Sequence, residues 1–302
     1  MINTVLGKIS KEKLGHTRIH EHILWAWTDN VRIKFDRKTV VSIILPHLKE
    51  LKSIGCDTLV EATPNGAGRD VSVLKELSEK ANLNIITNCG VWDGLDYNGA
   101  YIPQSIRKKS SHEIAEEWID EYEKGIDKSG IKPGIIKIGL GDNDVISDFQ
   151  RVFLKAAIIT SKYSGLPILS HICSSKSAIE IVEIVESENL ELDKIIWSHA
   201  DFAFDDITII ELAKRGIWIE LSWHTGQAEE YNWYIKTINR MRDLDLLDQL
   251  LVSQDAGGFH EGKIVSYRDF YTRFIQECVK NNISNEVVDR LLISNPSNAL
   301  DN

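Results

Sequence analysis

Short apolar runs alternate with longer amphipathic stretches along the whole chain. Several of the short runs are almost continuously apolar, which is typical of parallel strands buried on both faces. We predict strands at residues 17–23, 57–62, 83–88, 134–138, 167–171, 194–199, 217–221 and 250–253. The longer stretches have helical spacing, and the clearest predicted helices are residues 40–54, 111–124, 179–188, 206–215 and 267–281. Strands that alternate with helices are parallel and are joined by crossover helices.

Eight strand–helix units favour a closed (β/α)8 TIM barrel, which typically needs about 250 residues. The chain has 302 residues, and no linker or change of composition divides it, so we expect residues 1–302 to form a single α/β domain. An open doubly wound sheet is the alternative fold. It lacks support, because no Gly-x-Gly-x-x-Gly turn follows the first strand and there is no phosphate-binding loop. We therefore predict a barrel with its site at the carboxyl-terminal ends of the strands.

Composition and charge narrow the class of protein. The chain is 43% hydrophobic and 26% charged, as in a soluble globular protein with a sizeable core. Its formal net charge of -10 and the lack of a long basic cluster argue against nucleic acid or an anionic membrane as partner. There is no signal-peptide pattern, no apolar stretch near the ~20 residues of a membrane span, and the cysteines are scattered. We expect a cytoplasmic protein with reduced thiols that acts on a small molecule.

Four of the nine histidines lie on or at the ends of predicted strands. His20 and His22 are on the first strand, His171 ends the fifth and His199 ends the sixth. Because strand side chains alternate, His20 and His22 point to one face, which in a barrel can be the interior near the mouth. A lone strand-end histidine is more often a hydrogen-bonded core residue. Four at one level of a barrel instead favour a nitrogen-rich site for zinc, manganese or cobalt.

Asp255 and Lys137 extend this candidate site. Asp255 follows the last predicted strand, where an aspartate can bind a metal and accept a proton, although the segment can also be a simple turn. Lys137 interrupts the apolar fourth strand, and a charged, unpaired lysine is costly there. As a neutral amine it can react with carbon dioxide to give a carbamate that bridges two metals. The alternative is a lysine that extends to the barrel mouth or pairs with a carboxylate.

Residues 14–22 at the first predicted strand read Leu-Gly-His-Thr-Arg-Ile-His-Glu-His. This segment resembles the first-strand motif of the phosphotriesterase family, in the amidohydrolase superfamily. Further segments resemble its other motifs in the same order: Gly-Arg-Asp at 68–70, Lys-Pro-Gly-Ile-Ile-Lys at 132–137, Gly-Leu-Pro-Ile-Leu-Ser-His at 165–171, Ser-His-Ala-Asp at 198–201, Val-Ser-Gln-Asp at 252–255 and Asn-Pro at 295–296. The resemblance therefore spans almost the whole chain.

That resemblance implies a site with two divalent metal ions. His20, His22 and Asp255 would hold the more buried metal. The other two histidines, His171 and His199, would hold the more exposed metal. Carboxylated Lys137 and a hydroxide would bridge the pair. Zinc is the first expectation, with manganese, cobalt and iron as alternatives.

The resemblance also implies how such a site works. Two cations lower the pKa of the bridging water and polarise the carbonyl or phosphoryl oxygen of the substrate, so that hydroxide attacks. Asp255 would carry the proton out toward Asp201, the relay candidate, which is equally well placed to cap a helix. The resemblance to this family also makes a homodimer plausible.

Tryptophans and several polar residues lie on or near the predicted loops that follow the strands, where a barrel determines its substrate. The tryptophans can line a pocket for an apolar or ring-shaped substrate, or they can be ordinary lid packing. Each polar residue can touch an acidic or hydroxylated group or be a solvated loop residue. The candidate pocket residues are Trp25, Trp27, Trp92, Trp223, Trp233, His224, His260, Lys263 and Arg268.

The chain departs from the phosphotriesterases proper around its last two strands. The seventh strand runs into Ser222, Trp223 and His224 without the central histidine of those enzymes, and the loop 256–266 is short and glycine-rich. These departures weigh against organophosphate hydrolysis and favour a lactone or carboxylic ester, so we predict a lactonase or esterase. The alternatives are a phosphotriester hydrolase, an amide hydrolase or deaminase of the superfamily, and a non-catalytic binding protein. A nuclease is disfavoured by the negative charge.

Overall fold

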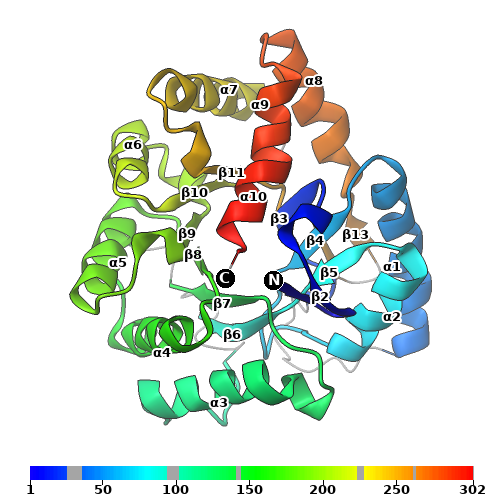
Figure 1. Cartoon of the computed structure of the whole chain (residues 1–302), viewed down its shortest axis with the longest axis vertical. Helices are drawn as coiled ribbons and strands as arrows, with labels where there is room; N and C mark the ends of the chain where they lie inside the picture. Colours follow the sequence, from blue (N-terminus) through cyan, green and yellow to red (C-terminus); the bar gives the residue numbers. More distant parts are fainter. Residues whose placement is uncertain (26–35, 94–101, 141–143, 223–227, 261–262, 302) are drawn as a thin grey trace.

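The computed structural model describes residues 1–25, 36–93, 102–140, 144–222, 228–260 and 263–301, with the backbone alone for 228–230, 259–260 and 263–265. Within these residues, a ring of parallel strands is surrounded by helices, and both termini lie near the centre of the ring (Figure 1). This is the predicted (β/α)8 barrel. No helix in the described ranges combines the length and the apolar character that crossing a bilayer requires.

The barrel strands follow one another around the ring in chain order. They are β3 (Thr17–Glu21), β4 (Thr58–Glu61), β5 (Asn84–Ile86) with β6 (Asn88–Trp92), β7 (Ile135–Gly139), β8 (Ile168–His171), β9 (Ile195–Ser198), β10 (Trp218–Leu221) and β11 (Leu250–Val252). Thr87 alone separates β5 from β6, and these two share the third position. The ring closes between β3 and β11, where the Asp255 amide donates to the His20 carbonyl at 3.2 Å. All eight predicted strands are present, and most ends lie within a residue or two of the prediction.

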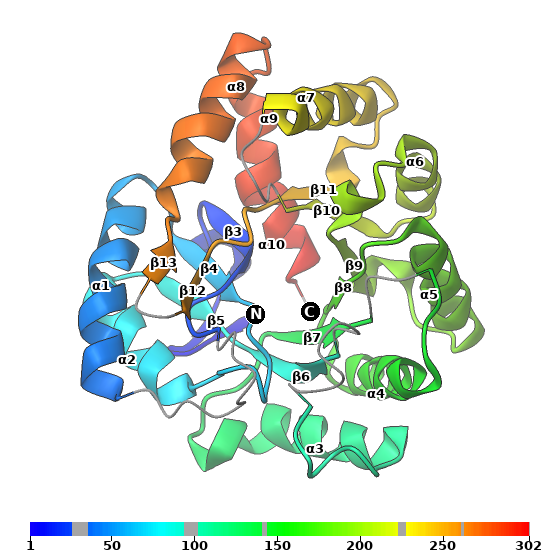
Figure 2. The same ribbon diagram turned by 180° about the vertical axis from the view of Figure 1, so that it is seen from behind.

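Helices form the outer layer of the barrel, as Figure 2 shows from behind. Those that follow the first seven strands are α1 (Arg37–Ser53), α2 (Val71–Ala81), α3 (Ser111–Lys124), α4 (Asp148–Ser164), α5 (Ser175–Ser187), α6 (Asp206–Lys214) and α7 (Ala228–Asp243). Capping boxes begin two of them, with Ser110 and Glu113 at α3, and Ser147 and Gln150 at α4. The sequence predictions omitted α2, α4 and α7.

The carboxyl-terminal part of the chain is helical, with two π-helical segments. Residues Phe270–Phe274 (η7) lead into α8 (Ile275–Lys280), and Arg290–Ser294 (η8) joins α9 (Asn285–Asp289) to α10 (Asn295–Ala299). Short 3-10 turns are η1 (Lys11–Lys13), η3 (Ile126–Lys128), η4 (Leu192–Lys194), η5 (Ala200–Ala203) and η6 (Leu247–Gln249).

Two antiparallel hairpins lie outside the barrel strands. One is β1 (Ile2–Thr4) with β2 (Gly7–Ile9). The other is β12 (Gly257–His260) with β13 (Lys263–Val265), so the segment expected to be only a short glycine-rich loop contains a hairpin.

One end of the barrel interior is apolar. Each strand position contributes one buried side chain to a single cluster, which is possible only where the strands face one another across the interior. Ile2, Leu14, Ala299 and Leu300 close this cluster from below, so the first and last segments of the chain seal the barrel. We call the barrel residues of this cluster the lower layer: Ile19, Val60, Ile86, Ile135, Leu169, Ile196, Trp218 and Leu251.

Candidate metal centre

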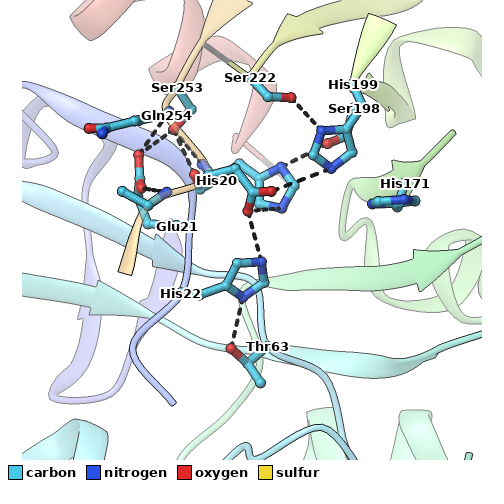
Figure 3. Close-up of polar contacts among 12 residues, drawn as sticks. His20, Glu21, His22, Thr63, His171, Ser198, His199, Ser222, Ser253 and Gln254 are labelled. Atoms are coloured by element: carbon cyan, nitrogen blue, oxygen red, sulfur yellow. Dashed lines mark hydrogen bonds and ion pairs between the residues drawn. The ribbon is translucent and has the colours of Figure 1, made fainter. Parts of the chain in front are cut away.

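The four strand-end histidines meet at the opposite end of the interior (Figure 3). The ring centroids of His20 and His22 are 5.4 Å apart, and those of His20 and His199 are 5.0 Å apart. His171 lies next to His199, with centroids separated by 4.2 Å. The pairing register of β3 shifts between Arg18 and Glu21, which lets Ile19 reach the lower layer while His20 also faces inward.

Asp255 and Lys137 lie among these imidazoles. Asp255 Oδ1 is 2.9 Å from His22 Nε2 and 3.5 Å from His20 Nε2, and its Oδ2 is 3.9 Å from His199 Nε2. Lys137 Nζ is 3.0 Å from His20 Nε2. Both Asp255 (φ +54°) and His199 (φ +67°) adopt left-handed backbone conformations, which turn these side chains into the site at the strand ends.

Burial determines the protonation of the cluster. It lowers the pKa of His20 and His199 well below the usual range, so both rings are neutral at pH 7. Burial also lowers the pKa of Lys137 to about 8, which makes its neutral amine accessible near physiological pH. Although burial acts to raise it, the pKa of Asp255 is held well below its usual range by His20 and His22. The site therefore combines neutral nitrogen donors with an ionised carboxylate.

A hydroxyl or thiol group lies against the second nitrogen of each imidazole. Ser198 Oγ is 2.7 Å from His20 Nδ1, and Thr63 Oγ1 is 2.9 Å from His22 Nδ1. The remaining contacts are Ser222 Oγ with His199 Nδ1 at 2.6 Å and Cys173 Sγ with His171 Nε2 at 3.7 Å. Figure 3 shows the Thr63 and Ser222 contacts. Metal-binding histidines are commonly oriented by a hydrogen-bond partner on the nitrogen that does not bind the metal.

The residues present fit divalent cations. Donor atoms of His20, His22 and Asp255 all lie within 4.8 Å of one another, a spacing that one ion can bridge. His199 Nε2 is buried and has no hydrogen-bond partner among the described residues, although it faces Asp255. A buried nitrogen without a partner is costly unless it binds something. Imidazole and carboxylate donors together suit zinc, manganese, cobalt or iron.

Glu21, the residue between the two first-strand histidines, supports the turn that carries Asp255. Its buried carboxylate pairs with Arg18 and accepts the Ser253 hydroxyl at 2.8 Å. It also accepts the Ala256 amide at 2.6 Å and the Gln254 amide at 3.1 Å. The sequence analysis did not identify this role of Glu21.

The remaining candidate residues divide into those near the cluster and those away from it. The Trp25 ring lies 4.6 Å from His22 and 5.3 Å from Trp92, whose own ring is 5.8 Å from His171. These two buried tryptophans therefore form a wall of the site. Arg268 is 58% exposed and pairs with Glu50 of α1 at 3.1 Å, so the structure does not bring it to the imidazoles.

Several candidates lie elsewhere or outside the description. Trp233 is partly buried and packs against Phe204, with centroids 5.5 Å apart. The side chains of His260 and Lys263 are not among those described. Residues Trp27, Trp223 and His224 lie outside the described residues.

Asp201, the relay candidate, is buried beside His199. Its Oδ1 accepts the Ser222 amide at 3.0 Å and its Oδ2 accepts the Tyr234 hydroxyl at 2.5 Å. Burial raises the pKa of Asp201 to about 6. Because Ser222 also contacts His199, Asp201 connects to the cluster through Ser222, and its role as a proton relay stays a prediction.

Two further buried acids were missed. Glu61 on β4 and Glu220 on β10 are both fully buried, and Glu220 accepts hydrogen bonds from Ser198 and Ser222. Each acid interrupts an apolar strand, as Lys137 does. The same signal that singled out Lys137 could therefore have found them.

Comparisons with known proteins agree with this geometry. The model of the "Phosphotriesterase family" matches residues 1–300. The phosphotriesterase homology protein of Escherichia coli (strain K12) is 25% identical over 96% of this chain and 99% of the relative. The N-acetyltaurine hydrolase of Homo sapiens is 24% identical, over 98% of this chain and 96% of the relative.

Solved structures show the same fold. A triple mutant of an organophosphorus hydrolase from Deinococcus radiodurans superposes with a TM-score of 0.86 over 100% of this chain and 97% of its own, at 22% identity. Fold, site geometry and family model agree: the chain belongs to the phosphotriesterase family and is a hydrolase.

Proposed function

We propose that this chain uses two divalent metal ions to hydrolyse a lactone or carboxylic ester. The observation that carries the proposal is the convergence of four imidazoles, Lys137 and Asp255 at one end of the barrel interior. In barrels whose active site lies at the carboxyl-terminal ends of the strands, the loops contact the substrate and the strand ends hold the reacting groups.

The donor set divides into two positions. His20, His22 and Asp255 would hold the more buried ion, since their donor atoms lie within 4.8 Å of one another. His171 and His199, whose rings adjoin, would hold the second. The neutral amine of Lys137 would react with carbon dioxide, and the resulting carbamate would bridge the two metal positions. Bound divalent cations supply an activated water and polarise the acyl group of the substrate.

The chain's own groups contribute the remaining functions. Asp255 is ionised and can accept the proton that the attacking water releases. Trp25 and Trp92 are buried beside the imidazoles, where they limit access of bulk water and offer an apolar wall for the acyl or ring portion of a substrate.

An N-acyl amide is the second candidate substrate. It is favoured by the relatives named N-acetyltaurine hydrolase, which align with nearly the whole chain at 23–24% identity. The two candidates differ in the leaving group, an alcohol from an ester and an amine from an amide. Measuring the released group therefore separates them.

The first test is metal content. Protein purified with bicarbonate and added divalent metal is analysed for metal per chain, in wild type, in Lys137→Ala and in the control Lys124→Ala, whose side chain is 74% exposed on α3. We expect about two ions in wild type and the control, and a marked loss in Lys137→Ala. About one ion, unaffected by Lys137→Ala, would contradict the binuclear proposal.

The second test is a substrate panel with lactones, aryl esters, N-acyl amino sulfonates and a phosphotriester. We expect the highest kcat/KM on the lactones or esters. Turnover of the N-acyl amides alone, with release of amine, would replace the ester proposal by the second candidate. Turnover of the phosphotriester alone would exclude both.

A further inference from the structure

A single buried carboxylate is connected by hydrogen bonds to two of the candidate metal-binding histidines. Glu220 is fully buried in the middle of β10, between Ile219 and Leu221. Its Oε2 accepts the Ser198 hydroxyl at 2.8 Å, the Ser222 hydroxyl at 3.3 Å and the backbone amide of His199 at 3.2 Å. A buried acid in an apolar strand is costly unless such donors satisfy it.

The two serines connect Glu220 to two different imidazoles. Ser198 Oγ is 2.7 Å from His20 Nδ1, and Ser222 Oγ is 2.6 Å from His199 Nδ1. The rings of His20 and His199 belong to different proposed metal positions, and their centroids are 5.0 Å apart. His22 is held separately, through Thr63. One acid therefore supports one histidine of each metal position.

The donors and acceptors available fix the direction of the hydrogen bonds that run from each imidazole through its serine to Glu220. As a carboxylate, Glu220 can only accept, and its Oε2 accepts from both serine hydroxyls and from the backbone N–H of His199. A serine hydroxyl has one proton, and once that proton is directed at Glu220 the oxygen can only accept from the imidazole. The proton of each neutral ring must then be on Nδ1, which leaves the lone pair on Nε2.

The opposite nitrogens agree with this direction. His20 Nε2 lies 3.0 Å from Lys137 Nζ, an amine that can donate to a lone pair. His199 Nε2 is buried without a hydrogen-bond partner among the described residues. Both Nε2 atoms also face Asp255.

We propose that Glu220 is a positioning residue that holds His20 and His199, through Ser198 and Ser222, in the tautomer that presents Nε2 to the two metal positions. Metal-binding histidines commonly bond a carboxylate directly. Here Glu220 Oε2 is 3.5 Å from His20 Nδ1, and the shorter contacts of both rings are to serine hydroxyls, which lets one acid serve two rings. The inference rests on the proposed function, because it takes the Nε2 atoms of His20 and His199 to be metal ligands.

The first experiment reads the imidazole protons without metal. Nitrogen-15 spectra of the metal-free full chain distinguish protonated from unprotonated ring nitrogens. We expect Nδ1–H at His20 and His199 in wild type, loss at His20 alone in Ser198→Ala, and loss at His199 alone in Ser222→Ala. Glu220→Met should lose both, whereas Glu220→Gln, whose amide oxygen still accepts, should keep both.

A purely space-filling role for Glu220 makes the opposite prediction, because Met fills a similar volume. Retention of both Nδ1 protons in Glu220→Met would overturn the inference. If Glu220→Met does not fold, the serine variants decide, because unchanged protonation in both of them is equally contradictory. Glu121→Met is the matched control, since Glu121 of α3 pairs with Arg69 and its loss should leave the imidazole signals unchanged.

The second experiment titrates Co²⁺ into the same variants. We expect Glu220→Met to weaken binding at both positions by about tenfold to 100-fold, and each serine variant to weaken one position. Adding Glu220→Met to the double serine variant should cause no further loss. Equal Co²⁺ affinity in wild type and Glu220→Met would contradict the inference. Wild type that binds no Co²⁺ but shows the expected tautomers would instead overturn the proposed function.

Discussion

The two ends of the barrel interior are built on the same strands but differ completely in chemistry. Ile135 and Lys137 are two residues apart on β7, and Ile196 and Ser198 are two residues apart on β9. The pairs Leu169 with His171 and Trp218 with Glu220 repeat the relation on β8 and β10. Residues two apart on a strand share a face, so the interior changes from apolar to polar over about 7 Å.

We expect the apolar end of the interior to contribute mainly to stability and the polar end mainly to function. Burial of the lower layer removes apolar surface from water and needs no partner to be favourable. The polar end gains little from burial, because each buried group there must recover its lost hydration through hydrogen bonds such as those of Ser198 and Glu220. We therefore expect substitutions at the two ends to affect different measurements.

The largest expected effect comes from extending the apolar layer upward with Lys137→Met. Loss of the proposed bridging group should lower kcat/KM at least about 1000-fold, or about 4 kcal/mol. The metal-free protein should meanwhile become more stable at pH 7, because a buried ammonium is removed. Chemical denaturation in carbon dioxide-free buffer measures this. A variant that is both active and less stable would contradict the division between the two ends.

The same variant carries a pH dependence. Burial lowers the pKa of Lys137 from 10.5 to about 8 in the folded protein. Between these values the unfolded chain binds a proton that the folded chain does not, so the stability contributed by Lys137 rises with pH. The stability advantage of Lys137→Met over metal-free wild type should therefore shrink from pH 8 to pH 10.

The converse substitution is Leu169→Ala in the lower layer. Leu169 is fully buried, so truncation should cost about 2–5 kcal/mol of unfolding free energy through lost burial and a cavity. Metal content should not change. The control Leu244→Ala, at a side chain 42% exposed, should stay within about 0.5 kcal/mol of wild type. Loss of metal from folded Leu169→Ala would show that the two ends are coupled.

A smaller effect is expected from Thr63→Val at the polar end. The substitution keeps the volume and removes the oxygen that contacts His22 Nδ1 at 2.9 Å. Metal affinity at the position of His22 and Asp255 should fall by about tenfold, or about 1.4 kcal/mol. Thr160→Val is the control, because the Thr160 hydroxyl is equally buried but donates to Ala156 within α4. Equal affinities in the two variants would argue against an orienting role for Thr63.

Much of the fold was predictable because burial leaves a local pattern. The barrel strands are apolar runs, and their order along the chain is their order around the ring. His20, His171 and His199 could be expected to converge, since parallel strand ends meet at one end of a barrel. The strands Ile2–Thr4 and Gly7–Ile9 are too short to show such a pattern. Their hairpin closes the far end of the interior through Ile2, a contact with residues distant in sequence.

The hydrogen bonds of the site depend on contacts between distant residues. Ser198 and His20 are 178 positions apart in sequence, and Ser253 and Glu21 are 232 apart. No spacing along the chain encodes which hydroxyl will face which ring. The sequence therefore indicated the groups that carry the chemistry but not those that orient them.

The smallest expected effect provides the closest comparison, because it uses two single-atom truncations on β9. Ile196→Val removes one methyl group from the lower layer and should cost about 1 kcal/mol of stability with unchanged metal affinity. Ser198→Ala removes one hydroxyl two residues later on the same face and should weaken metal binding at the position of His20. Denaturation and Co²⁺ titration of both variants test the pair. If both variants changed the same quantity, the boundary between the two ends would not lie between these residues.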